Sequence, residues 1–72
     1  MLAKFILNRM QIKYIYDHYI DYVINFERTD TYHYQAILRF NDKMLLAQAM
    51  RVIYGNHPNC KPKVTIMNTD LQ

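Results

Sequence analysis

The sequence predicts a single α+β domain, residues 1–72, in which both helices cover one face of an antiparallel sheet. Three observations support this fold class: two segments carry apolar residues at helical spacing, one alternates apolar and polar residues, and 51% of the chain is hydrophobic. A chain of 72 residues hides only about 60% of its unfolded surface, so we expect one modest core. One Gly and two Pro leave no room for a glycine-rich phosphate loop.

The N-terminal half predicts a strand, a helix and a second strand. Residues 4–7 form a short apolar segment, and Asn8 suits the N-cap of a helix. Apolar residues then recur every three or four positions from residue 9 to 21, which puts them on one helix face. They are Ile12, Ile15, Tyr16, Tyr19 and Ile20. Residues 22–27 are rich in β-branched and aromatic types and precede a polar turn, so we expect a strand leading into a hairpin.

The C-terminal half predicts a strand, a helix and a last strand. Residues 32–40 alternate, because Tyr32, Tyr34, Ala36, Leu38 and Phe40 share one side. Asn41 or Asp42 then caps a helix, and Gly55 sits where a left-handed residue commonly ends one. The apolar face of this helix consists of Leu45, Leu46, Ala49, Val52 and Ile53. Residues 63–67 read as the last strand, with Val64 and Ile66 inward.

The resulting order is β-α-β-β-α-β, the split arrangement of ferredoxin-like folds, with the second face of the sheet left open. A rival order, α-β-β-α-β, follows if residues 4–7 join the first helix, since so short an apolar run fits either period.

Composition argues against a membrane protein and a disulfide framework. The longest mixed apolar stretch, 12–24, is interrupted by Lys13, Asp17 and Asp21, and the first residues do not resemble a secretory signal. Cys60 is the single cysteine, which fits a reducing compartment. We therefore expect a cytoplasmic protein with no membrane partner. A net charge of +3 permits nucleic-acid binding without requiring it.

Function on such a fold depends on the side chains of the open face. Strand alternation predicts that odd-numbered residues from Val23 to Glu27 point outward and even-numbered ones inward. Glu27 would then lie beside His33 and Gln35 of the next strand. A carboxylate, an imidazole and an amide can hold Mg²⁺ or Mn²⁺ weakly, although no cofactor is required. The alternative is that the three are ordinary solvated side chains.

Four basic residues are candidates for binding phosphates: Arg39, Arg51, Lys61 and Lys63. They can equally serve solubility alone. Tyrosines on an open sheet could stack on bases, but Tyr32 and Tyr34 share the side of Leu38 and Phe40, so we expect them to be buried instead.

Several short motifs resemble those of initiator proteins for rolling-circle replication of small circular single-stranded DNA viruses and related plasmids. Residues 5–8 are similar to their first motif, 21–27 to their second strand with its metal-binding Glu, and 33–35 to their His-hydrophobic-Gln motif. Residues 69–72 resemble their Thr-Asp-x-Gln stretch. The resemblance implies single-stranded DNA as partner and Glu27, His33 and Gln35 as metal ligands. The family's cutting tyrosine lies beyond that stretch, so we expect binding without catalysis and no catalytic residue.

A second hypothesis belongs to a different class. The chain would be a small phage or mobile-element product that binds a host protein, as a homodimer joined through sheet edges or the open face. Val23, Ile37 and Met67 on that face would form the apolar patch that such a partner needs.

Overall fold

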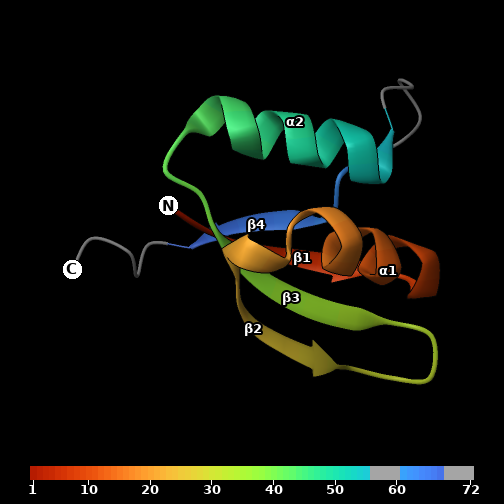
Figure 1. The fold of residues 1–72 in the computed structure, drawn as a ribbon. Coiled ribbons are helices and arrows are strands. Elements are labelled where there is room, and N and C mark those ends of the chain that lie inside the picture. Colours follow the sequence, from red (N-terminus) through yellow and green to blue (C-terminus); the bar gives the residue numbers. More distant parts are fainter. Residues whose placement is uncertain (56–60, 68–72) are drawn as a thin grey trace.

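Strands and helices follow one another in the predicted order (Figure 1). The computed structural model describes residues 1–55 and 61–67. The elements are β1 (Leu2–Leu7), α1 (Arg9–His18), the 3-10 turn η1 (Ile20–Tyr22), β2 (Val23–Arg28), β3 (Tyr34–Arg39), α2 (Lys43–Tyr54) and β4 (Val64–Met67). The four strands form one antiparallel sheet in the order β2-β3-β1-β4.

This order is that of a ferredoxin-like fold, so the predicted class is confirmed. The rival order is wrong, because Leu2–Leu7 pairs with β3 along one side and with β4 along the other. Both helices supply buried residues to the same face of the sheet, and the opposite face is uncovered by either helix (Figure 1).

Asn8 starts α1 directly after β1, as predicted. Its side-chain Oδ1 accepts from the Gln11 N–H at 2.8 Å, and Gln11 Oε1 accepts from the Asn8 N–H at 2.8 Å, which completes a capping box. This reciprocal pair satisfies N–H groups that the first helical turn leaves without partners. The sharp change from strand to helix at residue 8 therefore has a local cause.

The first helix ends at His18 rather than at residue 21, because the chain tightens into η1. Ile20 therefore lies outside the helix and is 46% exposed, and Tyr16, within the helix, is 49% exposed, although both were predicted on its apolar face. Ile12 and Ile15 are buried as predicted. The Tyr16 ring instead packs edge-on against Phe26 of β2, with ring centroids 5.5 Å apart.

Asp42, one of the two predicted caps, begins α2 by accepting from the Met44 N–H at 2.8 Å. Gly55 ends the helix with φ 89, a region that glycine enters without a Cβ clash, and its N–H donates to the Arg51 carbonyl at 2.9 Å. Leu46, Ala49 and Ile53 face the sheet and are buried, whereas the predicted core residue Val52 is largely exposed.

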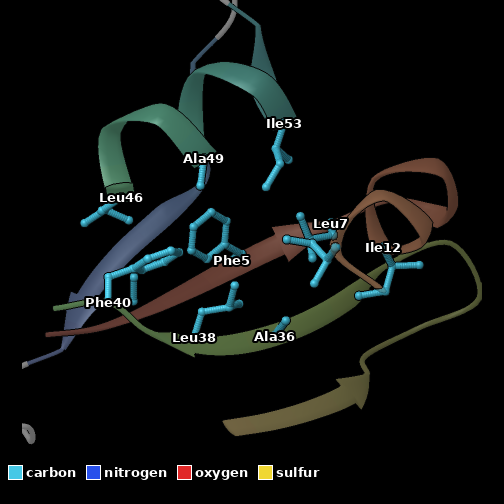
Figure 2. Packing of buried hydrophobic residues seen from close by; sticks show 11 residues of the cluster. Phe5, Leu7, Ile12, Ala36, Leu38, Phe40, Leu46, Ala49 and Ile53 are labelled. Carbon is cyan, nitrogen blue, oxygen red and sulfur yellow. The ribbon is translucent and has the colours of Figure 1, made fainter. Parts of the chain in front are cut away.

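The core lies between β1, β3 and the two helices (Figure 2). Its buried residues are Ala3, Phe5, Leu7, Ile12, Ile15, Ala36, Leu38, Phe40, Leu46, Ala49 and Ile53. Phe5 is central, with its ring 6.4 Å from that of Phe40 and 6.2 Å from that of Tyr54. The predicted inward residues of the 32–40 segment are thus confirmed from Ala36 to Phe40.

A bulge in β2 changes the predicted facing of its first residues. Val23 lies opposite Leu38 while Asn25 lies opposite Ile37, so Ile24 is an additional residue in the ladder. Val23 consequently packs against the core, and Ile24 is exposed, the reverse of the prediction for both. Asn25 and Glu27 keep their outward places because the register is regular from Asn25 onward.

Candidate nucleic-acid interface

We use the name open face for the side of the sheet away from the helices. Register and alternation give this face cationic, amide and aliphatic side chains. Its members are Leu2, Lys4, Ile6, Asn25, Glu27, Gln35, Ile37, Arg39, Lys63, Thr65 and Met67. Among these described residues Glu27 is the one carboxylate, against three cations.

The three cations are spread along the length of the open face. Lys4 lies at the centre of the sheet, opposite Ile37 of β3 and Thr65 of β4. Arg39 lies opposite Leu2 at one end of β1. Lys63 lies at the other end, where its carbonyl accepts from the Ile6 N–H at 3.0 Å. A nucleic-acid backbone crossing this face would pass one positive charge at the centre and one at each end.

Of the four basic residues predicted from sequence, two are on the open face and two are not. Arg39 and Lys63 belong to it, as just described. Arg51 lies on an exposed turn of α2, where it lines a cavity of about 250 Å³ together with Pro62. Lys61 is exposed and directly precedes Pro62 in the segment that leads into β4. Lys4 was not predicted from the sequence, although the alternation of apolar residues in β1 was a signal for it.

Two members of the proposed metal trio share a ladder position, because Glu27 lies directly opposite Gln35. The third, His33, lies in the turn, one residue before the start of β3. The His33 ring, however, is held by Asp30, with its Nδ1 3.0 Å from Asp30 Oδ1. Because a carboxylate only accepts, Nδ1 supplies the hydrogen of this contact, and Nε2 is the ring nitrogen that points to other partners. Within residues 1–55 and 61–67 no group of three His, Cys, Asp or Glu side chains is placed to hold a metal.

Asp30 organises the whole β2–β3 turn. Its Oδ1 accepts from the Tyr32 N–H at 2.7 Å and from the His33 N–H at 2.8 Å. These bonds, the Tyr32 N–H foremost and then the His33 side chain, hold the pKa of the Asp30 carboxyl below its usual value. The third strand therefore begins at Tyr34 and not at residue 32 as predicted, and Tyr32 lies outside the ladder.

Tyr32 is therefore 75% exposed instead of buried, contrary to the prediction. Tyr34 does pack inward, with its ring stacked on Phe26 at 5.6 Å between centroids. Tyr32, Arg9 and Arg28 line a common cleft between the beginning of α1 and the hairpin. No sequence pattern predicted a role for these three residues. None of the described residues of the open face is aromatic, so bases have no ring to stack on there.

A comparison of the chain with protein-family models, with curated proteins and with solved structures finds no match in any of the three. The resemblance to rolling-circle initiators therefore stays a prediction, and residues 69–72 of that resemblance lie outside the described residues, as does Cys60. Neither helix in the described part of the chain is long and apolar enough to cross a membrane.

Proposed function

We propose that this domain binds single-stranded nucleic acid through the open face and does not cut it. One observation carries the proposal: Lys4, Arg39 and Lys63 spread over a face whose described residues include one carboxylate. Lysine and arginine neutralise phosphates and release their counterions, which supplies most of the affinity of such interfaces.

A single strand suits this face better than a duplex does. Ile6 and Ile37 lie between the cations, and a flat face of this kind can contact the faces of unstacked bases, which a paired duplex keeps covered. Asn25 and Gln35 offer amide groups that both donate and accept hydrogen bonds. Without an aromatic platform on the described part of this face, binding depends mainly on charge and discriminates weakly between sequences.

Charge-neutral variants test the proposal directly. Lys4→Gln and Arg39→Gln should each weaken binding of a labelled oligothymidylate, measured by fluorescence anisotropy, and lower its salt slope by about 0.7 per lost phosphate contact. Lys13→Gln and Lys43→Gln are matched controls, because both residues are exposed on the helices and each substitution removes the same charge. Equal losses in all four variants would mean that net charge alone attracts the strand.

A divalent cation beside Glu27 extends the same proposal. Asp30 orients the His33 ring from its Nδ1 side, as carboxylates commonly orient metal-binding histidines, and His33 Nε2 and the Glu27 carboxylate would be the groups that hold such an ion. One carboxylate and neutral ligands give weak affinity for Mg²⁺ or Mn²⁺. When bound, the ion would supply positive charge for a phosphate of the strand.

A second candidate is self-association through β2. This edge strand has an unpaired side, and its residues from Ile24 to Arg28 are all exposed. Two copies could pair these edges in an antiparallel, self-complementary manner. Light scattering tests this second candidate. A monomeric wild-type protein would rule out self-association, and a dimer that persists in Phe26→Lys would show that β2 is not its interface.

A further inference from the structure

A cleft of about 450 Å³ opens between the first turn of α1 and the β2–β3 hairpin. Its volume is within the range of small-molecule sites. Arg9 and Met10 line it from the helix, and Arg28, Thr31, Tyr32 and Tyr34 line it from the hairpin. The cleft is on the helix side of the sheet edge, because Arg28 and Tyr34 pair with each other on the face of Ala36 and Phe26.

The two arginines give the cleft a positive charge, and one of them is held in place. The Arg28 Nε–H donates to the Asp30 carbonyl at 3.1 Å, and its Nη2 donates to the Thr31 carbonyl at 3.3 Å. The guanidinium has five N–H donors, so Nη1 and the second hydrogen of Nη2 stay available for a ligand. Arg9 is exposed at the opposite wall. No carboxylate is among the described residues that line the cleft.

The tyrosines give the cleft aromatic surface of two kinds. Tyr34 is half-buried, and its ring is already stacked on Phe26, so it forms a fixed wall. Tyr32 is the most exposed aromatic residue of the described chain, although its backbone N–H is fixed by Asp30. An exposed aromatic ring on an anchored backbone is a surface on which a planar ligand can stack at small entropic cost.

We propose that this cleft binds one nucleotide unit, with its base against Tyr32 and its phosphate between Arg9 and Arg28. A phosphate alone would leave the tyrosines without a role, and an uncharged planar ligand would leave the arginines unpaired. A nucleotide satisfies both, since arginine binds phosphate bidentately and every base has a face that stacks. Two acids are close in sequence to Arg28: Glu27 lies on the open face, opposite Gln35, and Asp30 has its Oδ1 occupied by N–H donors of the turn.

The inference does not rest on the proposed function. Lys4 and Arg39 belong to the open face, whereas the cleft belongs to the helix side. A free nucleotide can enter the cleft whether or not a strand binds the open face. If both sites are occupied by one strand, a base at the end of the strand would turn around the β2 edge into the cleft.

Titration with thymidine monophosphate, followed by NMR, tests the inference. The amide signals of Tyr32 and Met10 should shift first, and thymidine or inorganic phosphate alone should bind at least about tenfold more weakly. Tyr32→Ala should weaken binding by about tenfold, Tyr32→Phe should restore it, and Arg9→Gln should weaken it while the matched control Arg51→Gln does not. Lys4→Gln should leave these shifts unchanged even if it abolishes strand binding.

Two further ligands show whether the bound nucleotide is free or part of a strand, and whether the cleft prefers a nucleotide to another aromatic phosphate. A short oligothymidylate that shifts the same signals at lower concentration indicates a base within a strand, and one that does not indicates a free nucleotide. Phosphotyrosine is the competing class, because it also joins an aromatic ring to a phosphate. Equal affinity for phosphotyrosine, or nucleotide shifts that bypass Tyr32 and Met10, would overturn the proposal.

Discussion

The phenol of Tyr54, at the end of α2, donates a hydrogen bond to the backbone carbonyl of Ile6 in β1 at 2.7 Å. The Lys63 carbonyl is also within reach, 3.1 Å from the same phenolic oxygen. One helix side chain thereby connects β1 to the residue that enters β4, at the end of the sheet where Lys63 joins the open face. Burial raises the pKa of Tyr54 well above its usual value, because the phenolate would lose its hydration there.

Removing this hydroxyl should destabilise the fold. Tyr54→Phe keeps the ring against Phe5 but leaves the Ile6 carbonyl without its side-chain donor, so we expect a loss of about 1 kcal/mol in the free energy of unfolding. Urea denaturation measures it. Tyr16→Phe is the control, because the Tyr16 side chain is half exposed at the surface, and its stability should change little. An equal effect in both variants would show that the Tyr54 bond adds nothing.

The raised pKa also predicts an alkaline limit. Protonated Tyr54 is favoured by the fold, so its contribution is fully present below pH 10.0, the usual value, and declines as the pH rises toward the folded-state pKa. Tyr19, whose pKa is also raised by burial, acts in the same direction. Stability measured across this range should therefore fall less steeply in Tyr54→Phe than in the wild type, and identical slopes would contradict the assignment.

Two neighbouring residues of α2 should respond very differently to truncation. Ile53 is buried against the sheet, so Ile53→Ala should cost about 2–5 kcal/mol, while Val52→Ala on the exposed face should cost much less. If Ile53→Ala does not fold, Ile53→Val gives a measurable loss of about 0.5–1.5 kcal/mol. Similar losses at both positions in a monomer would mean that the helix faces the sheet differently.

The sequence predicted the order of the elements because the dominant signals are local. Alternation from Ala36 to Phe40, the stripe of Leu46, Ala49 and Ile53, and the Asn8 cap all depend on residues close in the chain. Each of them is present in the structure where expected. The order of the strands then follows from chain connectivity and the preference for short antiparallel connections.

The wrong structural predictions concern positions whose conformation or contacts depend on residues outside the segment's own pattern. The bulge at Ile24 depends on how β2 pairs with β3, which its own alternation does not reveal. Tyr32 continues the alternation of its segment, yet the Asp30 carboxylate binds the backbone there and ends the ladder. The cleft joins Arg9 to Arg28, which only the tertiary fold brings together. Of the candidate interface, sequence reasoning found Arg39 and Lys63 but not Lys4.

Metal binding has its own spectroscopic test. Mn²⁺ titrated into the labelled protein should broaden the NMR signals of Glu27 and His33 before others, because paramagnetic broadening falls steeply with distance from the ion. Glu27→Gln should remove this selectivity by deleting the one carboxylate of the site, while Asp17→Asn, an exposed acid on α1, should not. Broadening that is uniform, or that centres on Asp30, would leave the trio as solvated side chains.

Binding of single-stranded nucleic acid through the three cations of the open face should depend on the salt concentration. The association constant of the wild-type protein for an oligothymidylate should be measured at increasing NaCl concentrations. If Lys4, Arg39 and Lys63 each contact one phosphate, the logarithm of this constant falls linearly with the logarithm of the salt concentration, with a slope of about −2. A slope near zero, or no binding at the lowest salt concentration, would contradict this prediction.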